Sequence, residues 1–142
     1  MEYRKSEKEY YIRIDKGEEV LSTILELCRK ENILSAYFQG IGACDKVICQ
    51  TLDLSKNDFI THEKTGVLEM LSLLGNIAQK ENGEPTIHAH GSFSYVENEE
   101  VKLFGGHMKE GHICYTGEII LTPTDLPIKR TNETGMNIWK FQ

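Results

Sequence analysis

The stretch TIHAHGSFSYVENEEVKLFGGH, residues 86–107, contains three of the five histidines of this chain. Over residues 86–95 polar side chains alternate with apolar or small ones, which is the two-residue period of a half-buried strand. Successive side chains of a strand point to opposite faces, so His88 and His90 project from one face with their Cα atoms about 7 Å apart. We expect this stretch to carry the chemistry of the protein and the rest of the chain to support it.

The turn that follows this strand predicts its partner. Residues 97–100 form a polar run between two alternating apolar runs, so Val96 is expected to pair with Val101 across the turn. In that register His107 lies directly opposite His90, and the Cβ atoms of opposed residues are about 4.5 to 5.5 Å apart. A single bulge in the hairpin would turn His107 to the other face.

Three imidazoles that meet at one point favour a metal site. His88, His90 and His107 are predicted to hold zinc or another divalent transition metal, with the fourth tetrahedral position open to a small-molecule ligand. The two glycines that precede His107 would let a backbone or a ligand approach closely. The alternative interpretation is a polar strand face exposed to water. His62 and His112 have no comparable partners in the sequence and are expected to be surface histidines.

The composition limits the class of protein, with 39% hydrophobic and 27% charged residues as in an ordinary globular domain. No apolar run approaches the roughly 20 residues of a membrane span, and the N-terminal MEYRKSEKEYY has no apolar core, so we expect no membrane contact and a cytoplasmic protein. Four cysteines without CxxC spacing are expected to be reduced and structural: Cys28, Cys44, Cys49 and Cys114. The formal net charge of −6 disfavours non-specific binding to nucleic acid, because Lys and Arg must neutralise its phosphates.

One amphipathic helix is predicted over residues 18–32, where apolar residues repeat every three or four positions. Glu18 and Glu19 in its first turn, with Arg29 and Lys30 in its last, suit the helix dipole. Strands are predicted at residues 10–14, 35–41, 46–54, 59–64, 67–78, 86–95, 101–107, 113–122 and 136–141, with turns marked by residues such as Gly42 and Gly111. We predict one α+β domain over residues 1–142, with the helix packed on a mostly antiparallel sheet. A sandwich of strands alone is the alternative.

Residues 67–78, VLEMLSLLGNIA, form an unusually apolar strand. Strict alternation leaves both of its faces apolar except at Glu69 and Ser72. A strand of this kind needs cover on both sides, and one helix can cover only one side. We therefore expect either a subunit interface that includes Glu69, Leu71 and Leu73, or a two-layer core.

The order of these segments resembles the plants and prokaryotes conserved (PPC) domain. The likeness extends over residues 10–121 and rests on FQGIGACD at 38–45, TGVLEMLSLLGNIA at 65–78, PTIHAHGSFS at 85–94 and LFGGHMKEGHICYTGEIIL at 103–121. The resemblance implies an α+β fold with one main helix, a homotrimer, and a metal ion held by His88, His90 and His107.

In the plant members an AT-hook precedes this domain and enters the DNA minor groove, while the domain itself mediates assembly. This sequence shows no AT-hook, and Val67 stands where the plant motif Gly-Arg-Phe-Glu-Ile-Leu has arginine. We therefore predict a homotrimeric metal-binding protein that acts as a DNA-binding or regulatory interaction module, with DNA contacts weak or made through partners.

The fold also resembles that of acetolactate decarboxylase, which places three histidines on a zinc ion. The alternative function is therefore a zinc-dependent enzyme, lyase-like or hydrolase-like, acting on a small oxygen-rich ligand. Such an enzyme needs a positioned acid or base, and Glu69 is a candidate if it lies near the metal. Otherwise Glu69 is a surface or interface carboxylate.

Overall fold

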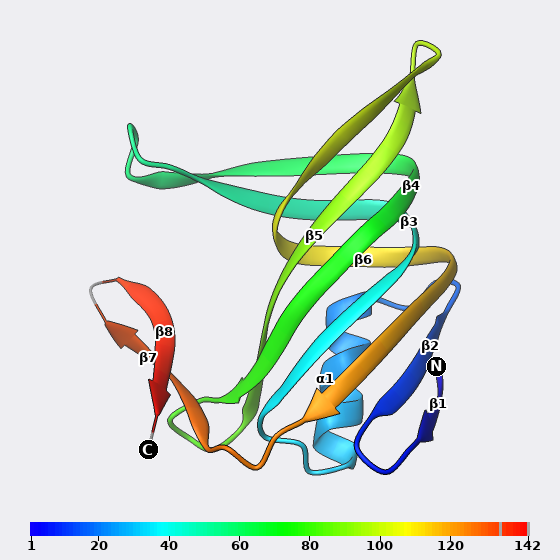
Figure 1. Cartoon of the computed structure of the whole chain (residues 1–142). Coiled ribbons are helices and arrows are strands. Elements are labelled where there is room, and N and C mark those ends of the chain that lie inside the picture. Colours follow the sequence, from blue (N-terminus) through cyan, green and yellow to red (C-terminus); the bar gives the residue numbers. More distant parts are fainter. Residues whose placement is uncertain (134, 142) are drawn as a thin grey trace.

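The computed structural model describes residues 1–133 and 135–141 and consists mainly of β-strands (Figure 1). In chain order the elements are β1 (Glu2–Lys5), β2 (Tyr10–Asp15), α1 (Val20–Lys30), β3 (Ala36–Asp53), β4 (Asp58–Gln79), β5 (Pro85–Glu97), β6 (Glu100–Pro123), β7 (Ile128–Glu133) and β8 (Met136–Phe141). Strands account for 71% of the described residues and helix for 8%. The predicted α+β class is therefore wrong, because the protein is mainly β with one short helix.

Long strands are the physical reason for this difference. Pairs of predicted strands are continuous in β3, β4 and β6, so Gly42 and Gly111 lie inside strands and not in turns. A Cβ atom on Gly42 would lie 2.4 Å from the carbonyl oxygen of Thr116, so this glycine serves the close approach of β3 and β6. Register shifts near Gly42 and between Cys44 and Lys46 bend β3 without ending it.

The strands form one sheet in the order β1-β2-β6-β3-β4-β7-β8, and β5 pairs with both β4 and β6. Since β3 also pairs with both β4 and β6, these four strands make a closed circuit of pairings. The sheet is mostly antiparallel, as predicted, and among the described residues its one parallel pairing joins β4 to β7. Strands β1 and β7 were not predicted, because their many charged side chains hide a strand pattern.

Helix α1 forms where it was predicted but is shorter, because both predicted first-turn glutamates precede it. Glu19 is the N-cap, and its carboxylate accepts hydrogen bonds from the N–H groups of Leu21 (3.1 Å) and Ser22 (2.7 Å). The same carboxylate accepts from the N–H of Gly111 in β6 at 3.1 Å. Glu19 therefore caps the helix and also ties it to the sheet.

The hydrophobic core lies between α1 and one face of the sheet. Its largest fully buried side chains are Phe38, Phe93, Ile14, Ile24, Leu27, Leu68, Met70, Leu73, Ile77, Ile113, Ile119 and Leu121. All four cysteines are free and buried, in agreement with the prediction of structural thiols. Burial raises the pKa of the Cys28 and Cys44 thiols to about 12, so these thiols are protonated at neutral pH. Within the described residues, no helix has the length and apolar character required to cross a bilayer.

Replacing Glu19 by Ala should lower the free energy of unfolding by about 0.5–2 kcal/mol, because the helix loses its N-cap acceptor. The Gly111 N–H loses its partner in the same variant. Urea denaturation followed by circular dichroism measures the change. Glu26→Ala is the matched control, since Glu26 is an exposed glutamate on the same helix and its loss should have little effect. Equal destabilisation by both substitutions would contradict the capping role.

Candidate metal centre

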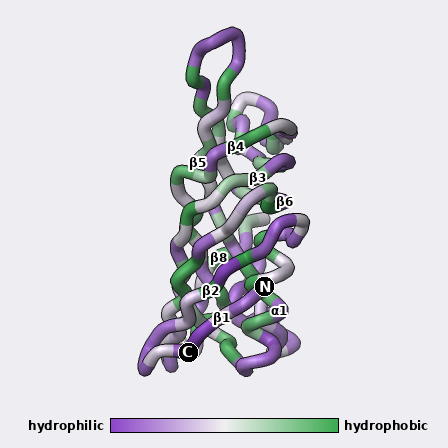
Figure 2. The backbone as a smooth tube through the Cα atoms, turned by 90° about the vertical axis from the view of Figure 1, so that its right-hand side faces the viewer, coloured by the Kyte–Doolittle hydropathy of each residue, from purple (hydrophilic) through white to green (hydrophobic). Residues whose placement is uncertain are grey.

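The β5–β6 hairpin has the predicted register. Val96 pairs with Val101 and His90 with His107. Its two-residue turn consists of Asn98 and Glu99, with φ of 53° and 63°. Positive φ at both positions is the type I′ geometry, whose twist matches that of the flanking strands. This turn forms the hydrophilic tip at the top of Figure 2.

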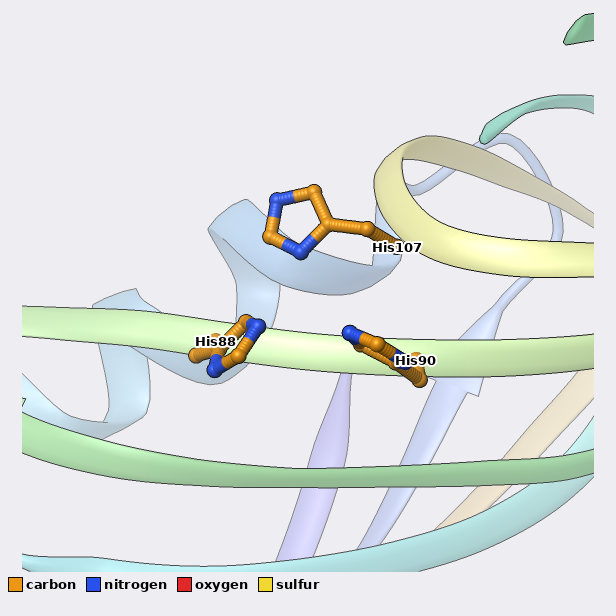
Figure 3. A group of neighbouring side chains, drawn as sticks. All are labelled: His88, His90 and His107. Carbon is orange, nitrogen blue, oxygen red and sulfur yellow. The ribbon is translucent and has the colours of Figure 1, made fainter. Parts of the chain in front are cut away.

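The three histidines meet on the sheet face opposite the core (Figure 3). His88 and His90 lie on β5, where Ala89 between them is buried, and His107 faces them from β6. The ring centroids are 5.1 Å apart for His88 and His90, 4.9 Å for His88 and His107, and 5.5 Å for His90 and His107. One ligand atom of each ring lies within 4.8 Å of those of the other two.

Two glycines let the backbone pass closely beside this cluster. A Cβ atom on Gly105 would lie 2.3 Å from the carbonyl oxygen of Gly91 in β5. Gly106 has a φ of 148°, and a Cβ atom there would lie 2.7 Å from the carbonyl oxygen of Gln50 in β3. The glycines expected to permit close approach therefore do so between strands, and they bring His107 next to β5.

Burial keeps two of the imidazoles uncharged. It lowers the pKa of His88 to about 4, with smaller contributions from the positive charge of Arg130 and from His107 and His90. The pKa of His107 is also lowered, first by burial and then by Lys109, His90 and Arg130. Protons therefore do not compete with a metal for these lone pairs at neutral pH.

The donor set fits a transition metal. With Zn–N bonds of about 2.0–2.1 Å, nitrogen ligands in a tetrahedral site are about 3.3 Å apart. The ligand atoms here are within 4.8 Å of one another, so small side-chain rotations would bring them to that spacing. A bound metal would supply a Lewis-acidic centre with one position open, while His88, His90 and His107 would hold and orient it.

The other predicted site residues do not join the cluster. Glu69 is exposed and pairs with Ser94, four residues along β5 from His90 and so about 13 Å away. Leu71 is exposed, but Leu73 is fully buried. The prediction that Leu73 lies on the same face of the strand as Leu71 is therefore wrong. A register shift between Met70 and Ser72 reverses the alternation of β4 at that point.

The remaining two histidines lie apart from the metal cluster. His62 is exposed, and the Nε2 atom of His112 lies 2.8 Å from a carboxylate oxygen of Glu110.

Three polar side chains beside the cluster, one of them in contact with His88, were not predicted from the sequence. The Nη2 atom of Arg130 in β7 lies 3.0 Å from the Nδ1 atom of His88 and 2.7 Å from the Oδ1 atom of Asn76. The indole N–H of Trp139 in β8 also donates to this Oδ1 atom, at 3.2 Å. Arg130 is 42 positions from His88, and no local pattern links the two residues.

These features define a small, mainly β protein with a three-histidine cluster that could hold a metal ion. The chain belongs to the family of the Plants and Prokaryotes Conserved domain, abbreviated PCC or PPC, whose profile matches residues 1–125. The family predicted from the sequence is thereby confirmed. No match to this chain was found among curated proteins.

Solved structures share this fold over nearly the whole chain. The PPC protein of Pyrococcus horikoshii is 32% identical, with a TM-score of 0.82, and the match covers 99% of this chain and 94% of that one. A protein of Ralstonia eutropha, named "putative DNA-binding protein", is 28% identical with a TM-score of 0.86 and coverage of 99% and 96%. A "metal-containing protein" of Archaeoglobus fulgidus is 22% identical with a TM-score of 0.81, at 99% and 96% coverage.

The predicted relation to acetolactate decarboxylase holds for the fold. The enzyme of Bacillus subtilis matches with a TM-score of 0.56 and 13% identity, over 88% of this chain and 56% of that one. This likeness concerns the arrangement of strands and says nothing of activity.

Purified, tag-free protein should contain one zinc ion per chain by elemental analysis. His90→Ala should release the ion while thermal unfolding changes little, because His90 is exposed on the face opposite the core. His62→Ala is the matched control and should keep the metal, since His62 lies outside the cluster. Wild-type protein that contains no metal and takes up none on titration would refute this prediction.

Proposed function

We propose that this protein is a homotrimeric, metal-binding member of its family that acts as a regulatory interaction module in the cytoplasm. Residues 1–142 act as one unit, and its contacts with DNA are weak or made through partner proteins. The observation that carries the proposal is the convergence of His88, His90 and His107 on one face of the sheet.

The surroundings of the cluster support a module more than an enzyme. An interaction module needs only a stably bound metal, whereas an enzyme needs an acid or base within reach of the open position. Glu69, the carboxylate considered for that role, lies four residues along the strand from His90. A relative of the same fold is named a metal-containing protein, which supports occupancy of the cluster.

The outer face of the sheet supports self-association. Ile41, Leu71 and Leu74 are 57%, 50% and 48% exposed there. They line a groove of about 790 Å³ that runs over β1, β2, β3, β4 and β6. Apolar patches of this kind mark interaction sites. Three copies arranged around these surfaces would bury the leucines that a monomer leaves in water.

The proposed link to DNA is indirect. A relative with 28% identity is named a putative DNA-binding protein, which supports a role near DNA. Three copies of a chain with a formal charge of −6 would carry −18, and phosphate contacts require Lys or Arg. Long-range repulsion therefore opposes direct binding unless a partner supplies the positive charge.

Substituting Leu71 by Asp should split the trimer into folded monomers, because a charge would enter the apolar contact. Leu73→Asp should instead unfold the subunit, since Leu73 is fully buried. Leu126→Asp is the control, because Leu126 has a similar exposure of 48% and lies outside the groove. Sedimentation velocity measures the mass, and a wild-type monomer at micromolar concentration would exclude the trimer.

The isolated protein should bind duplex DNA no more tightly than a dissociation constant of about 10⁻⁴ to 10⁻⁶ M at physiological salt, the non-specific range. Fluorescence anisotropy with two unrelated sequences measures the affinity and its sequence dependence. Submicromolar, sequence-dependent binding without a partner would instead establish direct recognition.

A further inference from the structure

Arg130 is a half-buried cation placed at the edge of the histidine cluster. Its guanidinium donates to Asn76, to the carbonyl oxygen of Asn137 at 3.1 Å, and to His88. None of these partners carries a negative charge. Arg130 lies on β7, beyond the residues that match the family profile.

One edge of this guanidinium contains a donor without an acceptor. The Nε atom of Arg130 is buried and has no hydrogen-bond partner among the described residues. Nε–H and one Nη2–H lie on the same edge of the planar group, and this edge binds a carboxylate through two parallel hydrogen bonds. Asn76 holds the Nη2 atom of this edge beside His88, and the indole N–H of Trp139 donates to the same Asn76 oxygen.

The contact between Arg130 and His88 conflicts with metal binding. Arginine is only a donor, so the Nδ1 atom of His88 must be the acceptor, and the proton of a neutral ring is then on Nε2. A metal on Nδ1 would displace the Arg130 N–H. A metal on Nε2 would move the ring proton to Nδ1, where two donors would face each other. In either case metal loading releases the Nη2–H from His88.

We propose that the released Nη2–H and the unpartnered Nε–H of Arg130 bind the carboxylate of a small ligand whose oxygen also occupies the open position of the metal. This inference rests on the proposed metal site and names the chemical class of its ligand. The carboxylate would separate the guanidinium from the metal ion and balance part of their positive charge. Arg130 is then the residue that selects an anion for the site.

Cobalt(II) in place of zinc makes metal binding and carboxylate binding measurable, because its absorption spectrum reports the ligands at the fourth position. In a non-coordinating buffer, acetate should change the spectrum of the cobalt-loaded wild-type protein saturably. Arg130→Gln should weaken acetate binding by about tenfold or more, because a charge-assisted double hydrogen bond is lost. The affinity of Arg130→Lys for acetate should lie between those of the wild type and Arg130→Gln, since lysine keeps the charge but cannot donate two parallel hydrogen bonds. Lys129→Gln removes a neighbouring positive charge and should bind acetate as tightly as the wild type.

A second measurement separates this role from a structural one. In acetate-free buffer Arg130→Gln should bind cobalt about fivefold more tightly than the wild type, because no guanidinium competes for His88. A substitution that merely loosened the site would weaken the binding of cobalt. Circular dichroism confirms that the variants are folded.

The outcomes keep the two proposals apart. A wild-type protein that binds no cobalt or zinc overturns the metal site and this inference with it. Bound cobalt with a spectrum that acetate leaves unchanged, or changes equally in Arg130→Gln, overturns the inference alone. Inorganic phosphate that binds more tightly than acetate, and depends on Arg130, overturns the assignment to carboxylates.

Discussion

The two-residue turn of Asn98 and Glu99 decides where the third histidine points. Both residues adopt positive φ, and this geometry joins β5 and β6 in a single register. Side chains alternate along a strand, so a slip of one residue would place His107 on the face of the core. The cluster of three imidazoles depends on this register.

Features set by neighbouring residues in the sequence could be predicted from it. The hairpin register followed from a polar run between two alternating strands, and the helix followed from its apolar periodicity. The fold class could not be predicted in this way, because Gly42 and Gly111 have the appearance of turn residues and in fact lie inside the long strands β3 and β6. Leu73 was misplaced for a related reason, since a register shift is a property of strand pairing and leaves no local mark.

Arg130 illustrates the limit of sequence reasoning about the site. Its strand, β7, contains two basic residues and one acidic residue in six, and pairs with β4 at one position only. Asn76 lies opposite His88 on β4 and brings the β7–β8 hairpin to the cluster through hydrogen bonds from Arg130 and Trp139. The contact between Arg130 and the cluster therefore depends on β4, β5 and the β7–β8 hairpin, and no spacing pattern in the sequence connects these three segments.

The core residues and the histidines of β5 lie on opposite faces of the strand, so the side chains that stabilise the fold are not those that could bind a metal. Ala89 and Phe93 pack into the core, while His88 and His90 project from the outer face. In small proteins that depend on zinc to fold, the ion supplies the free energy that a small core cannot. Here the core is formed without the imidazoles, so substitutions on the outer face can change the ligand without loss of the fold. Leu74 pairs with His90 on that face, so a subunit contact there would border the cluster and shield it from water.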